Sequence, residues 1–325
     1  MAIAQAGTSA GEIRVAVVGV GHFGRLHAEK YRDLPGARLV GVVDADGDRA
    51  AEIAAASGTK AFTALDQILG EVDAVSVAVP TRSHFEVASA CLAAGIHCLI
   101  EKPIAETVEQ ARALIELAKA RNRILQVGHL VRFDAAREAL DGLIDQPLFV
   151  EAHRIAPFKP RGTDVSVILD MMIHDIDLVL DLVGRPIASL DGVGVPVLGD
   201  HEDIANARIA FEGGCVANVT ASRISMKSER TLRLFQRSGY ARIDFIQRKL
   251  TFIRRGGPVV EGFPNFQIEE RDLPETDALK REIASFVGCV RSARPPLVDG
   301  EAGLRALDAA LRITRSLQAW AGRVS

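Results

Sequence analysis

Residues 13–44 read IRVAVVGVGHFGRLHAEKYRDLPGARLVGVVD, and this stretch decides how the first half of the chain folds. The β-branched run 13–18 is typical of a buried parallel strand, and it leads directly into 19–24, where three glycines have the spacing G-x-G-x-x-G. A helical segment follows, and then a second apolar run, 39–43, which ends at Asp44. Together these features predict a dinucleotide-binding unit rather than a bare structural turn.

The glycines of this turn meet three physical needs: a tight turn, close approach of the backbone to a pyrophosphate, and close contact between helix and strand. The N–H groups at the start of the helix then face the phosphates. Asp44 lies twenty residues after Gly24, where a carboxylate accepts hydrogen bonds from a ribose 2′-hydroxyl. Its charge repels a 2′-phosphate, and the neighbours Ala45 and Asp46 supply no cation. We therefore expect NAD as the cofactor, with NADP less favoured.

Length and composition limit the class of protein. A chain of 325 residues predicts two domains: an NAD-binding domain over 1–128, with 1–11 as a disordered tail, and a substrate-binding and oligomerisation domain over 129–325. The hydrophobic fraction of 48%, with 25% charged residues, is typical of globular proteins. A net charge of −3 gives no electrostatic reason to expect nucleic acid or an anionic membrane as a partner.

The cysteines and the apolar runs indicate the compartment. Cys91, Cys98, Cys215 and Cys289 have neither a C-x-x-C spacing nor a metal-ligand spacing, so we expect reduced thiols and no metal site. No apolar run reaches the length of a membrane span, and the first eleven residues lack the features of a signal peptide. The expected location is the cytoplasm.

Strand and helix signals alternate up to about residue 128, which predicts an α/β domain with a parallel sheet between layers of helices. Ser83 with Glu86 predicts a capping box at one helix start, and Thr107 predicts a cap at the next. Ligands bind at the carboxyl ends of the strands in such sheets. The predicted cofactor-binding residues lie at these ends, and they are Gly19, Gly21, His22, Phe23, Gly24, Asp44, Ala45, Val79, Pro80, Thr81, His84, Glu101, Lys102 and Gln126. For His22, His27 and His84, a packing or capping role and direct contact are both open.

The pattern changes after Gly128. We expect a helix over 132–144, a strand over 148–154, successive antiparallel strands from 187 to about 270, and two closing helices over 276–291 and 300–321. These elements predict a C-terminal α/β domain built on a mainly antiparallel sheet. Helices on one face leave the other face open, so we expect a homodimer or homotetramer through this sheet.

A long apolar segment, 167–183, carries a polar stripe of Asp170, His174, Asp177 and Asp181 at helical spacing. Buried carboxylates without partners are costly, so the stripe must meet a cleft, a partner or itself. Asp170 and His174 alone would suit a structural pair. Together with Lys102 they suit the oxidation of an alcohol: Asp170 orients His174, His174 exchanges the hydroxyl proton, and Lys102 binds the reacting oxygen.

Several arginines flank this segment. Either they are solvated, or one or two of them bind an anionic group of the substrate. With Lys102, Asp170 and His174 they complete the predicted substrate-binding residues, and they are Arg132, Arg154, Arg161 and Arg223. The fork of an arginine suits a pyrophosphate better than the point charge of a lysine does.

The combined motifs resemble the glucose–fructose oxidoreductase, inositol dehydrogenase and MocA family (Gfo/Idh/MocA). They are GVGHFGRLHA at 19–28, Asp44, EKP at 101–103 and D-x-x-x-H-D-I-D at 170–177. The resemblance covers nearly the whole chain. It implies a Rossmann domain followed by an α/β domain with a large, open sheet. It also implies that Lys102, Asp170 and His174 match the family's catalytic lysine, aspartate and histidine, and that the Lys102–Pro103 bond is cis.

The substrate is a narrower question. The long aliphatic form of the second motif, residues 164–184, is similar to that of family members that act on nucleotide sugars. This similarity implies oxidation of a UDP-N-acetylhexosamine at its 3-position. A free sugar or inositol dehydrogenase is the alternative, as is a catalytically silent regulatory protein on the same fold. A silent relative would be expected to lose the lysine or the histidine, and both are present here.

Overall fold

The computed structural model describes residues 11–158, 165–256 and 265–324. Of the predicted tail, only Gly11 lies inside these ranges, and Arg161 lies outside them. The chain divides into two compact units, each described here by itself: Met1–Gly128 with Leu279–Gly303, and His129–Ala278 with Leu304–Ser325. One boundary between the two units falls at Gly128. Residues 279–303 belong to the unit that contains the N-terminus, although they follow the second sheet in the sequence.

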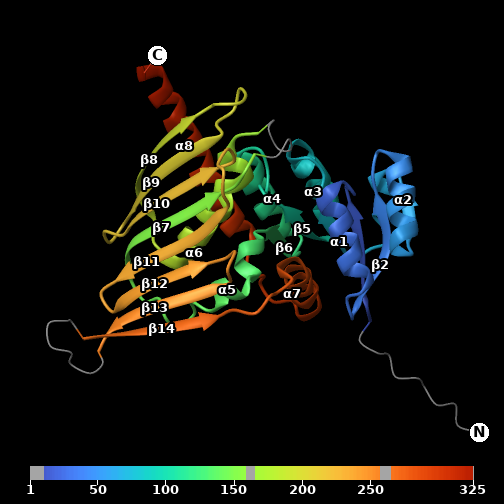
Figure 1. Ribbon diagram of the computed structural model, residues 1–325. Helices are drawn as coiled ribbons and strands as arrows, with labels where there is room; N and C mark the ends of the chain where they lie inside the picture. The colour runs from blue at the N-terminus through green and yellow to red at the C-terminus, as the bar shows by residue number, and fades with distance from the viewer. Residues whose placement is uncertain (1–10, 159–164, 257–264, 325) are drawn as a thin grey trace, which may run out of the picture. The chain divides into compact units, whose positions relative to one another are not determined.

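The first unit is built on a six-stranded parallel sheet with the order β3-β2-β1-β4-β5-β6 (Figure 1). The order reverses between β1 and β4, which is where doubly wound sheets bind dinucleotides. The strands are β1 (Ile13–Val18), β2 (Ala37–Val43), β3 (Lys60–Phe62), β4 (Ala74–Val77), β5 (His97–Glu101) and β6 (Leu125–Gly128). The parallel sheet confirms the predicted fold class, and the short β3 was not predicted.

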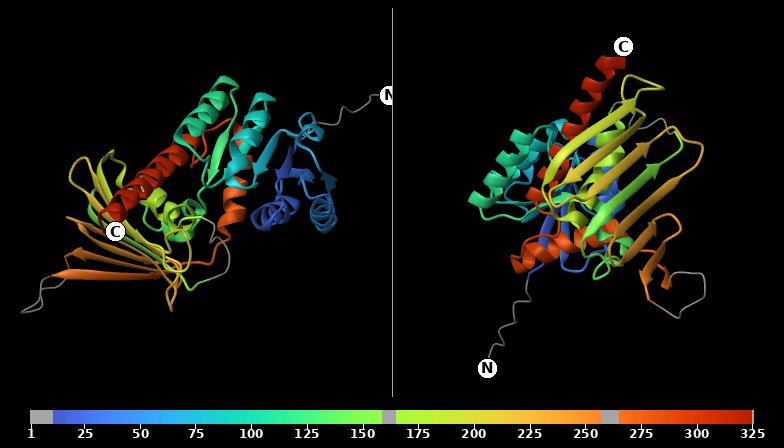
Figure 2. Two further views of the ribbon diagram at one scale, coloured as in Figure 1. Left: turned by 90° about the horizontal axis from the view of Figure 1, so that it is seen from above. Right: turned by 90° about the vertical axis from the view of Figure 1, so that its left-hand side faces the viewer.

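Helices cover both faces of this sheet. They are α1 (His22–Arg32), α2 (Gly47–Ser57), α3 (His84–Ala93), α4 (Val108–Ala120) and α7 (Ala278–Ser292). In Figure 2, α1 and α2 lie on one face, and α3 and α4 lie together on the other. The apolar β-branched side chains of the strands are therefore enclosed on both sides, and β4 and the last four residues of β1 are buried.

One predicted cap is wrong. Thr107 does cap α4, since its hydroxyl accepts a hydrogen bond from the backbone nitrogen of Gln110 at 3.2 Å. Ser83 does not cap α3. Thr81–Ser83 forms a 3₁₀ turn that runs directly into α3, so Ser83 already has nearly helical backbone angles and its hydroxyl makes no cap bond. An N-cap needs an extended backbone, which the turn removes.

The second unit is built on an eight-stranded sheet with the order β14-β13-β12-β11-β7-β10-β9-β8. Only β7 and β10 pair in parallel, so the sheet is mainly antiparallel, as predicted. The strands are β7 (Pro147–Ile155), β8 (Ile187–Val195), β9 (Ile204–Phe211), β10 (Val216–Ser222), β11 (Glu229–Gln236), β12 (Gly239–Asp244), β13 (Lys249–Arg255) and β14 (Phe266–Asp272).

One face of this sheet is covered and the other is open. The helices α6 (Ile173–Val183) and α8 (Gly300–Val324) lie on the same side of the sheet (Figure 2). A Cβ on Gly192 would lie 2.7 Å from the side chain of Leu317 on α8, so this glycine permits close packing. Val193 and Val195, which alternate with it, are exposed on the opposite face.

Two helical segments differ from the prediction. The expected helix over 132–144 is reduced to a 3₁₀ turn at Leu130–Phe133 and a single helical turn, α5 (Ala135–Glu138). The polar-striped segment is not one regular helix either. It begins with a π-helical turn at Ile168–Met172 and becomes α-helical at Ile173.

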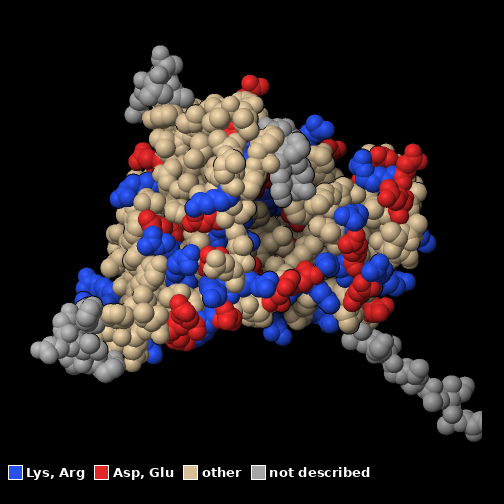
Figure 3. Space-filling model, in the orientation of Figure 1, with Lys and Arg blue, Asp and Glu red and all other residues tan. Residues whose placement is uncertain are grey.

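Positive and negative side chains are mixed on one face of the molecule. Blue and red side chains are interspersed on the face drawn in Figure 3, which agrees with the small net charge. All four cysteines are free thiols, and Cys91, Cys98 and Cys215 are buried. Among the described helices, none combines the length and the apolarity needed to cross a membrane.

Candidate functional site

The glycine turn has the geometry that a dinucleotide requires. Gly19 has a φ of +82°, and a Cβ there would lie 2.7 Å from the backbone nitrogen of Val79. A Cβ on Gly24 would collide with the carbonyl of Gly19, so α1 and the turn pack too closely for a side chain. Gly21 is the N-cap of α1, and its Cβ position is open space. The first turn therefore keeps backbone N–H groups for a pyrophosphate, and these residues fit the cofactor.

Asp44 lies at the end of β2, beside this turn. Its carboxylate accepts hydrogen bonds from the backbone nitrogens of Val20 at 2.9 Å and Asp46 at 3.0 Å. The guanidinium of Arg49 on α2 lies 3.5 Å from the Asp44 carboxylate and 2.9 Å from that of Asp46. Arg49 is not adjacent to Asp44 in the sequence, and only the first turn of α2 brings its side chain back to the strand end.

The strand ends that carry Val79 and Pro103 are linked by His84. Its two ring nitrogens lie 2.8 Å from the carbonyl oxygen of Pro103 and 2.9 Å from that of Val79. Burial lowers the pKa of His84, and the two carbonyl contacts oppose this change. His84 is therefore a brace between two loops, which favours the packing role. The Lys102–Pro103 bond is cis, as the resemblance implied.

A buried polar cluster lies next to Lys102 in the first unit. Nε2 of His27 lies 2.8 Å from Oε1 of Glu101, and both side chains are buried. Glu282 of α7 is completely buried, and neither of its carboxylate oxygens has a hydrogen-bond partner among the described residues. Gln126, predicted to contact the cofactor, instead donates its amide to the backbone carbonyl of Glu282 at 3.2 Å. The contact with Glu101 favours the packing role for His27.

The pKa values of the two carboxyl groups in this cluster are shifted in opposite directions. Burial and the nearby charge of Glu101 raise the pKa of Glu282 well above its ordinary value. Burial alone would raise the pKa of Glu101 too, but the bond from His27 and the charges of His27 and Lys102 lower it overall. The environment therefore favours the ionised form of Glu101 and the protonated form of Glu282.

His27, Glu101 and Glu282 are also the one group in the described parts of the chain that could offer three ligands to a metal ion. Their ligand atoms lie within 4.8 Å of one another. The His27–Glu101 separation of 2.8 Å is that of a hydrogen bond and is shorter than the distance of about 3.3 Å between ligands of a tetrahedral zinc ion. The geometry favours a shared proton over a metal.

Glu282→Gln tests this protonation state. A raised folded pKa means that the folded state keeps its proton while the unfolded state loses it, so stability falls as pH rises above the unfolded pKa. Glutamine cannot ionise, so the variant is expected to melt a few degrees above the wild type at pH 8, with the gain disappearing toward pH 4.5. Thermal denaturation across this range measures it. Glu116→Gln, on the exposed face of α4, is the control. If the melting temperatures of the wild type and Glu282→Gln changed with pH in the same way, the raised pKa of Glu282 would be refuted.

In the second unit, Asp170 and His174 lie on either side of the change in helix type. Asp170 is in the π-helical turn, and His174 is in the first turn of α6. The rotation of 100° per residue of a regular α-helix therefore does not apply between Asp170 and His174. Such π turns are frequent at functional sites. The ring centroids of His129 and His174 are 6.4 Å apart, edge to face.

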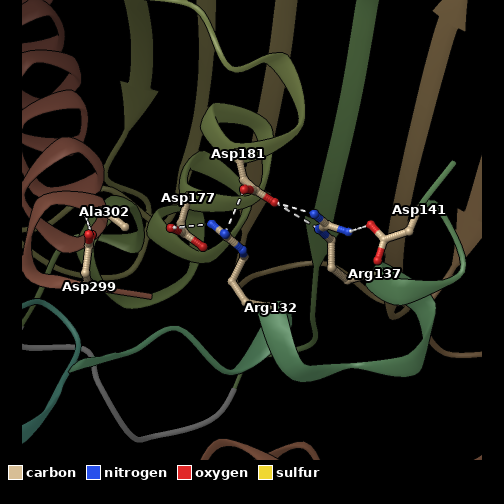
Figure 4. Close-up of polar contacts among 7 residues, drawn as sticks. All are labelled: Arg132, Arg137, Asp141, Asp177, Asp181, Asp299 and Ala302. Carbon is tan, nitrogen blue, oxygen red and sulfur yellow. Dashed lines mark hydrogen bonds and ion pairs between the residues drawn. The ribbon is translucent and has the colours of Figure 1, made fainter. Parts of the chain in front are cut away.

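The rest of the polar stripe meets arginines, which was one of the outcomes that the sequence allowed. Arg132 lies 2.7 Å from the carboxylate of Asp181 and 3.4 Å from that of Asp177, and Arg137 continues the row from Asp181 to Asp141 (Figure 4). Arg132 is only 6% exposed. Its guanidinium is thus occupied inside the unit, and the geometry does not favour the predicted contact with substrate.

Two other predicted arginines also have carboxylate partners. Arg154 makes a two-pronged contact with Asp175, with Nε–Oδ2 at 2.6 Å and Nη2–Oδ1 at 2.8 Å. Arg223 is buried, donates from Nε to Asp203 at 2.8 Å and from Nη1 to the carbonyl of Val165 at 2.7 Å. Arg223 therefore ties the sheet to the loop before α6, which is a structural use.

Two further charged residues in unusual surroundings were not predicted from the sequence. Glu282 lies on the apolar face of α7 between Leu279, Ile283 and Phe286, and an acid at such a position is a usable signal in the sequence. Arg230 on β11 is the second, and its surroundings are described below. No periodicity marks it, because it follows Glu229 at the start of an ordinary strand.

Comparison with known proteins extends these observations. Residues 13–129 match the model of an oxidoreductase family with an NAD-binding Rossmann fold, and residues 133–242 match the model of the GFO/IDH/MocA C-terminal domain. The first of these regions contains the glycine turn, Asp44 and Lys102. The second contains Asp170 and His174.

Individual relatives match over nearly the full length. The chain is 42% identical over 312 residues to a UDP-N-acetylglucosamine 3-dehydrogenase from Acidithiobacillus ferrooxidans, covering 96% of this chain and 99% of the relative. The solved structure of that enzyme superimposes with a TM-score of 0.90 over 94% of this chain and 98% of its own. A scyllo-inositol 2-dehydrogenase (NAD(+)) from Bacillus subtilis is 27% identical, covering 88% of this chain and 89% of the relative.

Proposed function

The chain belongs to the Gfo/Idh/MocA family of oxidoreductases, and we propose that it is an NAD-dependent dehydrogenase of a nucleotide sugar, oxidising the 3-hydroxyl of a UDP-N-acetylhexosamine. The observation that carries this proposal is the 42% identity to the UDP-N-acetylglucosamine 3-dehydrogenase over 96% of the chain. The inositol dehydrogenase of Bacillus subtilis is a more distant relative at 27%. A free sugar or inositol is therefore the second candidate.

The chemistry is assigned to three side chains. NAD, when bound at the glycine turn and Asp44, supplies an acceptor for the hydride that leaves the carbon. Lys102 donates a hydrogen bond to the reacting oxygen and stabilises negative charge on it. His174 accepts the hydroxyl proton, which an imidazole can do near neutral pH. Asp170 orients His174. The motifs EKP and D-x-x-x-H-D-I-D support these roles, and both are intact.

The cofactor preference rests on Asp44. We expect the wild type to bind NAD more tightly than NADP. Asp44→Ala is expected to weaken NAD about 10- to 100-fold, because charge-assisted hydrogen bonds to the ribose are lost. The same variant is expected to bind NADP better than the wild type, because Arg49 then lacks the Asp44 carboxylate beside it. Titration of both cofactors, followed by fluorescence, measures this.

Asp46→Asn is the matched control for Asp44→Ala. It removes the other charge beside Arg49 but keeps an oxygen that caps α2. Its affinity for NAD is expected to stay near that of the wild type. Tighter binding of NADP than of NAD by the wild type would refute the role given to Asp44.

The substrate is tested by NADH formation across a panel. UDP-N-acetylglucosamine is expected to be oxidised far more efficiently than free N-acetylglucosamine, myo-inositol or scyllo-inositol. Binding of the remote nucleotide holds the ring in place for reaction, so its removal raises the barrier. Equal rates with the nucleotide sugar and the free sugar would transfer the assignment to the second candidate. No oxidation of any compound would favour the silent regulatory protein.

We also propose assembly and location. A homodimer or homotetramer would cover the open face of the eight-stranded sheet, where Val193, Val195 and Ile204 are exposed on neighbouring strands β8 and β9. Exposed apolar side chains on adjacent strands are typical of such contacts. The proposed location is the cytoplasm, where NAD and nucleotide sugars are available. Light scattering of the purified protein measures the assembly.

A further inference from the structure

Two arginines lie directly opposite each other in the second unit. Arg154 near the end of β7 is paired in register with Arg230 near the start of β11. Residues paired in this way project from the same face of a sheet. Arg154 reaches Asp175 of α6, so this face is the one that the helix covers. Like charges directly opposite each other are destabilising, and the pair therefore needs negative charge nearby.

The described residues supply less negative charge than the pair needs. Asp175 is committed to Arg154 through two hydrogen bonds. The guanidinium of Arg230 lies 4.6 Å from the ring centroid of Phe245, and its Nε is buried without a hydrogen-bond partner among the described residues. Burial and the charge of Arg154 lower the pKa of Arg230 to about 10, although Asp175 and Asp134 oppose this change. Two cations thus share one close carboxylate.

The arginine pair lies close to the proposed acid–base residue. Asp175, which holds Arg154, directly follows His174 in the first turn of α6. The arginine pair therefore lies against the turn that carries the proposed proton acceptor. A nucleotide sugar bears its diphosphate on C1, two carbons from the 3-hydroxyl. An anion site close to the acid–base residue is where such a substrate would place its phosphates.

We propose that Arg154 and Arg230 bind the diphosphate of the nucleotide sugar, and this inference rests on the proposed function. Asp175 fixes the plane of the Arg154 guanidinium, which leaves its Nη1 for one phosphate oxygen. Arg230 supplies a charge that makes no ion pair with the described residues, although Asp175 and Asp134 act on it from a distance. Planar guanidinium groups bind phosphate oxygens in pairs, which suits them to this task. Arg230 is then a substrate-binding residue that determines specificity for nucleotide-linked sugars.

Arg230→Met is the decisive variant, because methionine keeps an apolar chain against Phe245 and removes the charge. The affinity for UDP, measured by calorimetry, is expected to fall about 10- to 100-fold, and KM for UDP-N-acetylglucosamine is expected to rise similarly. The slow reaction with free N-acetylglucosamine is expected to be unchanged. The melting temperature of the ligand-free variant is expected to equal or exceed that of the wild type, because a partly buried cation that makes no ion pair with the described residues has been removed. Arg230→Lys is expected to recover part of the affinity.

Controls and outcomes separate this inference from the proposed function. Arg271→Ala, on the edge strand β14, removes an exposed arginine of the same unit and is expected to change none of these values. Wild-type activity on UDP-N-acetylglucosamine, with unchanged UDP affinity and KM in Arg230→Met, would overturn the inference and leave the function intact. A lower melting temperature with unchanged UDP affinity would assign Arg230 a structural role. A wild type that does not bind UDP and oxidises only free sugars or inositols would overturn both the inference and the proposed function.

Discussion

Lys102→Ala and His174→Ala are each expected to lower turnover by about 100-fold or more, which is the usual contribution of a positioned acid–base group. Lys102 would stabilise charge on the reacting oxygen, and His174 would remove its proton, so each loss acts on the chemical step. Affinity for NAD is expected to change little, because the pyrophosphate and ribose contacts are assigned to the glycine turn and Asp44. Initial rates with UDP-N-acetylglucosamine and cofactor titrations measure the two effects separately.

Matched controls come from exposed residues of the same types. Lys119→Ala on α4 removes a lysine that pairs with Glu116 and Glu301 at the surface, and His201→Ala removes an exposed histidine before β9. Both are expected to keep full turnover. Asp170→Asn is expected to act more mildly than His174→Ala, since it affects only the orientation of the imidazole. Full activity of Lys102→Ala or His174→Ala would remove that residue from the mechanism.

The first unit could be predicted from the sequence because its signals are local. A β-branched run predicted β1 with its observed ends, and Thr107 predicted the cap of α4. Each of these features depends on a few consecutive residues. Ser83 shows where local logic fails. Its capping pattern was genuine in the sequence, but the 3₁₀ turn before it took the backbone away from the extended conformation that a cap requires.

The arrangement of charges could not be predicted, because it depends on contacts between segments far apart in the chain. Glu282 lies close to Glu101 although α7 follows the whole second sheet in sequence. Arg154 and Arg230 become neighbours only through the pairing of β7 with β11. Sequence spacing placed Asp170 and His174 on one face of a regular helix, and the π turn between them altered that geometry. Residue types were predicted well, but their partners were not.

Arg132→Ala is expected to reduce the free energy of unfolding by about 3–5 kcal/mol, the range for removing one partner of a buried ion pair. Arg132 and Asp177 are almost completely buried, and Oδ2 of Asp177 has no hydrogen-bond partner among the described residues. Burial already raises the pKa of Asp177, with Arg132 among the cations that oppose this change. Without Arg132, Asp177 would lose this ion pair, since Arg137 contacts Asp181 and Asp141 rather than Asp177.

Urea denaturation at two pH values tests this expectation, because the loss should depend on ionisation. Removing Arg132 raises the folded pKa of Asp177 further, so the loss is expected to be largest at pH 8 and to shrink as Asp177 takes up its proton toward pH 5. Arg132→Ala with Asp177→Asn is expected to regain part of the stability, since the uncompensated charge is gone. Arg312→Ala, which removes an exposed ion pair with Asp308 on α8, is expected to cost about 0–1 kcal/mol. A loss in Arg132→Ala no larger than in Arg312→Ala, at both pH values, would mean that Asp177 is already neutral in the folded protein and that Arg132 contributes little more than a surface arginine.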